Sequence, residues 1–320
     1  MALLGAPAVL RAQAPLRLPL STVLPDTNFH TVNCRRFADE VRQATGGAVE
    51  IDVKSGGQLA FTGPEQMRAV RDALVPMADF MSTQQAGDEP VLGIEGLPFL
   101  AADIEELRTL HRFIRPAFDE VALRNEQTIL YVVPWPAQYL HLRVKAETVG
   151  ALRDIKIRVP DRECRDMAAA IGMAPALIPW AETLPALSSG EVSGVATSAF
   201  SAANGKLWEV VKFFHATSQQ WSSQIVSINN DSWRRIAADH RQAIMDVARR
   251  LEPAFWQSSV DVDAESRRQL AAGGMALVTP SAAMMAELRQ RTSRLLAIFM
   301  ERVPAAEAPL KAYLADRKRA

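Results

Sequence analysis

The alternation of strand-like and helix-like segments constrains the fold of this 320-residue chain more than any other feature of its sequence. Leu16, Leu18 and Leu20 alternate with other residues as in a half-buried strand, and Asp26 or Thr27 is the expected N-cap of the helix that follows. In the first half of the chain, strands are predicted at residues 16–20, 49–53, 78–81 and 129–133, and helices begin near residues 27, 63 and 103. Such alternation predicts an α/β fold with a mostly parallel sheet.

The same pattern restarts after residue 150, which indicates a second lobe. Strands are predicted at residues 156–159, 176–178, 192–197 and 224–228, and helices at 161–171, 182–188, 233–272 with a break near Pro253, and 282–303. The expected division is residues 15–135 plus 223–262 for lobe I and residues 136–222 plus 263–320 for lobe II, with long C-terminal helices spanning both. Ligands of such folds bind where the strand ends of two lobes face each other.

Composition narrows the class of protein. The chain carries 36 basic and 36 acidic residues, and this zero net charge argues against a general nucleic-acid binder, which needs a basic surface. A hydrophobic share of 48% and a charged share of 22% are typical of a globular protein with a sizeable core. No apolar run approaches the roughly 20 residues of a transmembrane helix.

The N-terminus indicates export. Residues 2–10 are small and apolar, and Ala12-Gln13-Ala14 has the small-x-small pattern of a signal-peptidase site, although no positive segment precedes it. Residues 1–14 are therefore expected to be a signal-peptide remnant and the protein is expected in the periplasm. The alternative is a short apolar helix packed on the domain. Removal of these residues takes away Arg11 and leaves 35 basic and 36 acidic residues.

Other chemical signals are weak. Cys34 and Cys164 are too few for a disulfide framework, and two free thiols are expected. The five histidines show no metal-binding spacing, and the chain has no nucleophile elbow, P-loop or dinucleotide fingerprint. No catalytic residue, metal or cofactor is predicted.

Several motifs together are specific in their order and spacing. They are Phe37-Ala38-Asp39-Glu40-Val41, Thr45-Gly46-Gly47, Gly57-Gln58-Leu59, Leu97-Pro98-Phe99-Leu100, Lys156-Ile157-Arg158-Val159-Pro160, and Glu182 with Ala186-Leu187 ahead of Gly190-Glu191-Val192. Over residues 16–303 the chain resembles the solute-binding subunits of TRAP transporters, the DctP-like extracytoplasmic receptors for organic acids. The resemblance implies a two-lobed periplasmic-binding-protein-like fold (type II-like, TRAP subclass). It also implies a non-enzymatic, monomeric receptor that passes a small organic acid to TRAP membrane permease subunits.

The resemblance assigns the ligand carboxylate to Arg158. A guanidinium offers a planar fork that meets a carboxylate bidentately, and the pair is stronger in a cleft that excludes water. The alternative is a surface or interdomain salt bridge. Some relatives carry a second arginine where this chain has Gln138, whose amide can still donate a hydrogen bond. Thr197 falls where relatives place a carboxylate-binding asparagine, and Ser198 is its neighbouring candidate, although Val192-Ser193-Gly194 departs from the family's Val-Asp-Gly.

The remaining matched positions are apolar, and the resemblance implies that they form the cleft wall. They are Trp180, Phe29, Met81, Trp135 and Trp221. The alternative for each is core packing, which is preferred for Trp208, Trp233 and Trp256 because they lie at helical spacing among apolar residues.

One arginine, neutral polar partners and an aromatic wall predict a monocarboxylate with an apolar or aromatic body, such as a 2-oxo or 2-hydroxy acid. Small aliphatic 2-oxo acids and fatty acids remain open. Two other functions also remain open. One is a receptor that feeds a membrane sensor kinase, and the other is a periplasmic α/β enzyme that uses His141 or Glu182 as a base.

Overall fold

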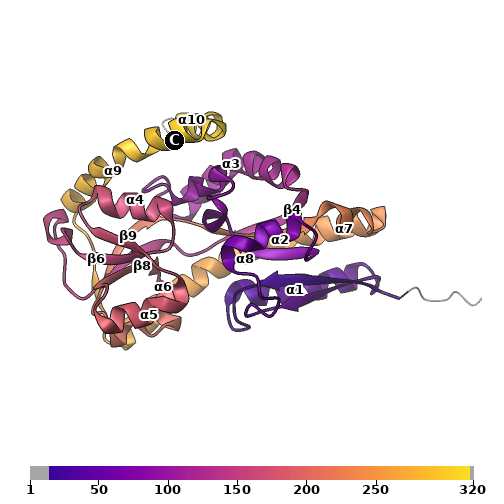
Figure 1. The fold of residues 1–320 in the computed structure, drawn as a ribbon, viewed down its shortest axis with the longest axis horizontal. Coiled ribbons are helices and arrows are strands. Elements are labelled where there is room, and N and C mark those ends of the chain that lie inside the picture. Colours follow the sequence, from indigo (N-terminus) through magenta and orange to yellow (C-terminus); the bar gives the residue numbers. More distant parts are fainter. Residues whose placement is uncertain (1–13, 318–320) are drawn as a thin grey trace, which may run out of the picture.

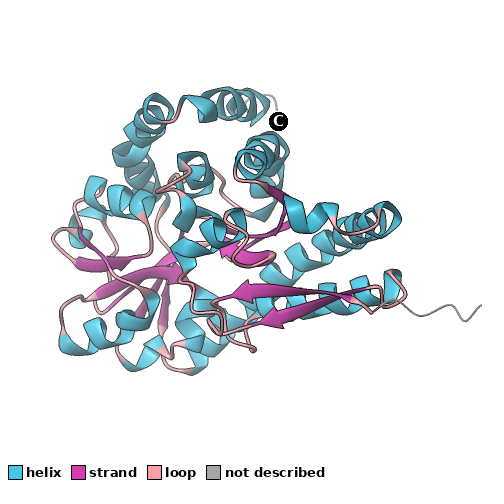
Figure 2. Ribbon diagram, turned by 45° about the vertical axis from the view of Figure 1, so that its right-hand side comes forward, coloured by secondary structure: helices cyan, strands magenta, loops and turns pink. Residues whose placement is uncertain are grey.

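The computed structural model describes residues 14–317 and has two lobes, each built on its own β-sheet (Figure 1). Within these residues the first sheet has the strand order β2-β1-β3-β10-β4, and the second has the order β11-β9-β5-β8-β6-β7. Helices cover the faces of both sheets (Figure 2). The predicted two-lobed α/β class is confirmed. The predicted signal-peptide remnant falls almost entirely outside the described residues.

The first sheet comprises β1 (Leu16–Thr22), β2 (Val49–Lys54), β3 (Met77–Met81), β4 (Gln127–Pro134) and β10 (Ser223–Asn229). Its helices are α1 (Phe29–Ala44), α2 (Gln66–Arg71), α3 (Ile104–Arg124) and α7 (Asn230–Arg234). The second sheet comprises β5 (Gln138–Leu142), β6 (Lys156–Val159), β7 (Ala174–Leu177), β8 (Gly194–Ser198), β9 (Phe213–Gln220) and β11 (Ala276–Val278). The second lobe also contains α4 (Arg162–Ala170), α5 (Trp180–Ser189) and α6 (Ala199–Asn204). The chain ends with α8 (Ala238–Ala272), α9 (Ala282–Arg302) and α10 (Glu307–Arg317).

Both sheets are mostly parallel, as predicted, and each contains one strand that runs against the others. In the first sheet β1 is parallel to β2 and β3, but β10 is antiparallel to both of its neighbours. In the second sheet β5 is antiparallel to β8 and β9. These two strands enter directly from the other sheet without a crossover helix, so they start at the edge where their parallel neighbours end.

Two short segments carry the chain between the sheets. One joins β4 to β5 through residues 135–137, and the other joins β9 to β10 through residues 221–222. They lie side by side, because the backbone N–H of Trp135 donates to the carbonyl of Ser222 at 2.8 Å. Helix α8 packs on α1 and β4 of the first lobe and also on α6 of the second. The lobes are therefore held by two adjacent strand crossings and one long helix.

Helices α9 and α10, here called the belt, run along one side of both lobes (Figure 1). Helix α9 packs on α4 of the second lobe, and α10 packs on α3 of the first. The hydroxyl of Tyr313 donates to the carbonyl of Leu100 at 2.9 Å and helps to fix α10 there. The expected spanning role of the long C-terminal helices is confirmed, although α10, placed with lobe II at the sequence level, contacts lobe I.

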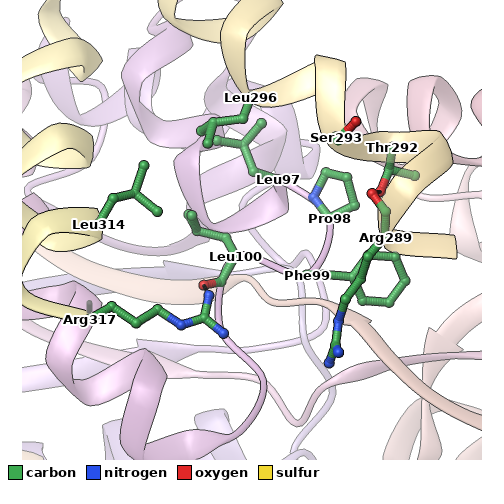
Figure 3. A pocket seen from close by; sticks show the side chains of 10 residues that line it. All are labelled: Leu97, Pro98, Phe99, Leu100, Arg289, Thr292, Ser293, Leu296, Leu314 and Arg317. Carbon is green, nitrogen blue, oxygen red and sulfur yellow. Dashed lines mark hydrogen bonds between the residues drawn. The ribbon is translucent and has the colours of Figure 1, made fainter. Parts of the chain in front are cut away.

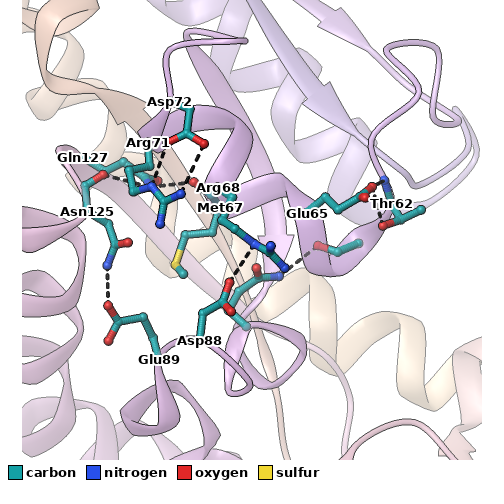
Figure 4. Close-up of polar contacts among 12 residues, drawn as sticks. Thr62, Glu65, Met67, Arg68, Arg71, Asp72, Asp88, Glu89, Asn125 and Gln127 are labelled. Carbon is teal, nitrogen blue, oxygen red and sulfur yellow. Dashed lines mark hydrogen bonds and ion pairs between the residues drawn. The ribbon is translucent and has the colours of Figure 1, made fainter.

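Polar contacts hold the loop at residues 88–89 to α2 and to the segment before β4 (Figure 4). Arg68 forms an ion pair with Asp88 at 2.8 Å, and the amide of Asn125 donates to Glu89 at 2.5 Å. The amide of Gln127 donates to the carbonyl of Met67 at 2.9 Å. These contacts join parts of the first lobe that are far apart in the sequence.

Two helix predictions need correction. Helix α1 starts at Phe29 and its N-cap is Asn28, whose side chain accepts the N–H of His30 at 2.9 Å. Asp26 instead accepts a hydrogen bond from Ser55. Helix α8 continues through Pro253, because the buried residues around it pack on the first lobe and offset the roughly 3 kcal/mol that an internal proline costs.

The described residues contain no helix with both the length and the apolar character needed to cross a membrane. Cys34 and Cys164 are buried and unpaired, as the sequence predicts.

Candidate functional site

Arg158 is a buried charged group of the second lobe. It lies on β6, and its side chain is almost fully buried with a residue exposure of 5%. The guanidinium Nε donates to the carbonyl of Ile178 at 2.8 Å, and Nη1 lies 3.5 Å from the carbonyl of Ala196. Two main-chain oxygens therefore accept from Nε and Nη1 and set the orientation of the guanidinium.

The electrostatics of Arg158 favour an anion. Burial lowers the pKa of Arg158 to about 10, and the negative charge of Asp161 opposes this shift only in part. The group is thus still a cation at neutral pH. No carboxylate within residues 14–317 lies within 4.0 Å of it. A buried charge without a counterion is unfavourable, so this position suits a ligand that brings a negative charge.

The polar candidates lie on strands beside Arg158. Strand β8 is the neighbour of β6, with Arg158 opposite Val195, and Thr197 follows two residues later. Gln138 is paired with Ser198 in the adjacent strand β5. The Ser198 hydroxyl caps α6 by accepting the N–H of Ser201 at 3.1 Å, so it has a structural task of its own. The sheet brings these side chains to one edge.

Trp180 lies beside Arg158. It is the first residue of α5, and the centre of the Arg158 guanidinium is 5.6 Å from the centroid of its ring. This distance is within the range of a cation–π interaction. Trp180 is 42% exposed as a residue, so it is free for another contact.

An aromatic group joins the two lobes. The ring of Phe29, at the start of α1, lies 5.1 Å from Phe200 of α6 and 5.6 Å from Trp135, both edge-to-face. His30 lies 4.6 Å from Trp135. Phe200 follows Thr197 by three residues, so the Arg158 region and this aromatic group are adjacent through the link from β8 to α6.

The other two apolar candidates lie in different surroundings. Met81 is partly buried at the end of β3 and packs with the cluster that contains Phe29 and Trp135. Trp221 belongs to a different cluster, and its indole N–H donates to the carbonyl of Ala101 at 3.0 Å. The described contacts therefore bring Met81, but not Trp221, to the aromatic group.

Asp79 is a buried acid close to this group that the sequence did not single out. Its carboxylate accepts the hydroxyl of Thr22 at 2.9 Å. Burial raises the pKa of Asp79 to about 6, and hydrogen bonds from Gln224 and Thr22 oppose the shift. The amide oxygen of Gln224 in turn accepts the indole N–H of Trp135 at 3.2 Å. Trp135 of the aromatic group therefore contacts a buried polar network through Gln224, and Asp79 is the titratable acid of that network.

We expect Asp79→Asn to stabilise the protein at high pH. Because the folded pKa of Asp79 is raised, its contribution to stability is complete below pH 3.8 and is lost as the pH rises through about 6. Asparagine removes the charge and still accepts from Thr22, so the unfolding free energy should exceed that of the wild type by about 2 kcal/mol at pH 8. Urea denaturation at pH 4, 6 and 8 measures the difference. A difference that does not grow with pH would contradict this assignment.

Phe200, His30, Asp79 and Gln224 were missed at the sequence level. Phe200 stands in an Ala-Phe-Ser-Ala stretch without strong periodicity, and its contact with Phe29 joins residues 171 positions apart in the chain. No local signal marks such a pair.

Within the described residues, no three His, Cys, Asp or Glu side chains gather as a metal site would require.

Comparison with known proteins identifies related chains. Residues 20–302 match DctP, bacterial extracellular solute-binding protein, family 7. The fold is similar to that of DctP7, a Bordetella pertussis extracytoplasmic solute receptor binding pyroglutamic acid, with 26% identity and a TM-score of 0.88 over 93% of this chain and 99% of that one. It is also similar to a marine metagenome TRAP solute-binding protein specific for pyroglutamate, with 26% identity and a TM-score of 0.86 over 95% of this chain and 100% of that one.

An uncharacterized protein of Haemophilus influenzae is 20% identical over 199 residues, which is 61% of this chain. The chain spans 60% of the length of that curated relative.

Proposed function

Because the chain belongs to the DctP family of bacterial extracellular solute-binding proteins (family 7), a family of TRAP solute receptors, we propose that it captures a small organic monocarboxylate. The receptor acts outside the cytoplasmic membrane. It delivers the acid to the permease subunits of a TRAP transporter. Its role is binding and transfer, without chemical conversion of the ligand.

One observation carries this proposal, the buried Arg158 guanidinium without a carboxylate partner among the described residues. The ligand carboxylate supplies the missing charge and pairs with the side of the guanidinium at Nη2, which neither carbonyl contacts. Gln138 is neutral where a second arginine would suit a dicarboxylate. The ligand therefore carries one carboxylate at this position, and Gln138 or Thr197 receives its second polar group.

The apolar part of the ligand packs on aromatic surfaces. Trp180 offers the exposed part of its ring next to Arg158. Phe29, Met81 and Trp135 form the opposite wall, together with Phe200. Ser198 contributes by holding α6, and with it Phe200, in place. Trp221 supports the second crossing from the core side.

The ligand class follows from these groups. A compact acid with one carboxylate, one neighbouring hydrogen-bonding group and an apolar body fits them. Pyroglutamate has these features and is bound by the two similar receptors, so it is the first compound to test. A 2-oxo or 2-hydroxy acid has the same pattern, with its second oxygen beside the carboxylate.

Binding acts through lobe closure. The proposed carboxylate site belongs to the second lobe, whereas Phe29 and Met81 belong to the first. A ligand that contacts both lobes favours the closed arrangement over the open one, and this differential affinity shifts the population. Closure also removes water, which strengthens the ion pair with Arg158.

The experiment is a thermal-shift panel of organic acids on the purified chain. We expect L-pyroglutamate, or a 2-oxo or 2-hydroxy acid, to raise the melting temperature, because a ligand that binds only the folded state stabilises it. The uncharged amide of the same acid is the matched control and should give no shift. If only dicarboxylates or sugar acids raised the melting temperature, the monocarboxylate assignment would be wrong. No shift with any acid would oppose the receptor function itself.

A further inference from the structure

A cavity lies between helices α9 and α10 and the loop at residues 97–100, and Arg158 does not line it (Figure 3). Its volume is about 350 Å³, at the lower end of the range of small-molecule sites. Helix α9 contributes one wall, α10 another, and the loop at residues 97–100 the floor. None of the groups that surround Arg158 lines it.

Most of the lining is apolar. Leu97, Leu100, Leu296 and Leu314 face the cavity together with Pro98 and Phe99 (Figure 3). The floor is fixed to the rest of the molecule, because the N–H of Phe99 donates to the carbonyl of Gln219 at 2.8 Å. A fixed apolar surface of this kind suits the hydrocarbon part of a ligand.

Two arginines provide the polar part of the cavity. Arg317 forms an ion pair with Glu106 at 3.0 Å and also donates to the carbonyl of Leu100 at 3.1 Å. Arg289 is exposed at the rim, and no acidic group within residues 14–317 lies within 4.0 Å of it. Glu106 neutralises one of the two positive charges, so the net charge at the cavity is about +1. The hydroxyls of Thr292 and Ser293 lie on the same wall (Figure 3).

We propose that this cavity binds an amphiphilic organic monoanion, a carboxylate with an unbranched hydrocarbon chain. Arg289 pairs with the carboxylate at the rim of the cavity. The hydrocarbon chain of the ligand extends between Leu296, Leu314 and the loop at residues 97–100. A dianion is disfavoured because Arg317 is already paired, and a neutral lipid would leave Arg289 without its partner. This site is separate from Arg158 and does not depend on the proposed function.

The test is isothermal titration calorimetry of the full chain with sodium octanoate as the probe. Octanoate is expected to bind with a dissociation constant on the order of a millimolar or below, given its size. Arg289→Glu should weaken binding by roughly tenfold or more, because it replaces attraction by repulsion. Ser293→Trp should block binding by filling the cavity without changing its charge. Arg294→Glu on the same helix is the matched control, since Arg294 is exposed and does not line the cavity.

Arg158→Ala separates the two sites. If octanoate binding is lost in Arg289→Glu and kept in Arg158→Ala, the inference holds, whatever acid binds at Arg158. If binding is lost in Arg158→Ala and kept in Arg289→Glu, octanoate occupies the other site and the inference is overturned while the proposed function gains support. Equal effects of Arg289→Glu and Arg294→Glu, or no heat of binding at up to about ten millimolar octanoate, also overturn it.

Discussion

Arg158→Ala is expected to weaken binding of the carboxylate ligand by at least about 100-fold. Loss of one partner of a buried, hydrogen-bonded charge pair costs about 2–5 kcal/mol, which corresponds to roughly 30- to 5,000-fold in affinity. The upper part of that range applies here, because Arg158 is only 5% exposed. Calorimetric titration of the acid found in the thermal-shift panel measures the change.

Two variants give this prediction its controls. Arg158→Lys keeps the charge and loses the planar fork, so its affinity should fall between those of the wild type and the alanine variant. Lys156→Ala removes a basic residue from the same strand at an exposed position and should leave affinity unchanged. Circular dichroism checks that each variant is folded. Equal affinities of wild type and a folded Arg158→Ala would remove the basis of the proposed carboxylate site.

The largest expected loss of stability comes from Glu95, which lies in a buried polar cluster at the second crossing. Its carboxylate is 2.5 Å from Nε2 of His111 and accepts hydroxyls from Ser223 at 2.6 Å and Ser82 at 2.9 Å. Ser223 is the first residue of β10, and the carbonyl of Glu95 accepts the N–H of Trp221. The cluster therefore links α3 and the turn after β3 to the point where the chain enters the first sheet.

Glu95→Gln should lower the unfolding free energy at pH 7 by about 3 kcal/mol, because it replaces one carboxylate oxygen by an amide N–H and leaves buried hydrogen-bonding groups of Ser82, His111 or Ser223 without their acceptor. Glu105→Gln is the matched control. Glu105 pairs with Arg108 on the exposed face of α3, so its loss should change stability by less than about 0.5 kcal/mol. Urea denaturation measures both variants. Similar small effects for the two would show that the Glu95 cluster is not stabilising.

The pH dependence gives Glu95 a second signature. Burial alone raises the pKa of Glu95, but attraction to His111 and hydrogen bonds from His111, Ser223 and Ser82 outweigh it and hold the pKa below its ordinary value of 4.5. A carboxyl with a lowered folded pKa stabilises the protein above pH 4.5, and this contribution is lost as the pH falls through the folded value. The difference between wild type and Glu95→Gln should therefore shrink below pH 4.5. Asp79 acts in the opposite direction between pH 3.8 and 6.

The elements with strong periodicity could be predicted from the sequence. Strands β1, β2 and β6 and helices α3 and α9 lie within a few residues of their predicted positions, because apolar spacing and capping residues such as Asp103 mark them locally. Strand β9 was missed, since its second half reads Thr-Ser-Gln-Gln and is buried by the neighbouring lobe and not by its own apolar pattern. Helix α10 was missed because it is short and its apolar residues are spread around the helix and do not form one clear face.

The residues of the candidate site also fall into those that the sequence indicated and those that it could not. Arg158 was found through a motif on one strand, and its neighbours Thr197 and Ser198 through the motif that follows. Their proximity depends on β6 and β8 being adjacent, which the local sequence does not specify. The pairing of Phe29 with Phe200 needs both lobes in place, so no local pattern could predict it.

A crystal structure of the wild-type protein with L-pyroglutamate, or with the acid that gives the largest thermal shift, tests the central claim most directly. The account predicts a ligand between the two lobes, with its carboxylate oxygens about 2.8 Å from the guanidinium of Arg158 and its apolar body against Trp180. A carboxylate bound to other residues, with Arg158 still paired only to the carbonyls of Ile178 and Ala196, would contradict it.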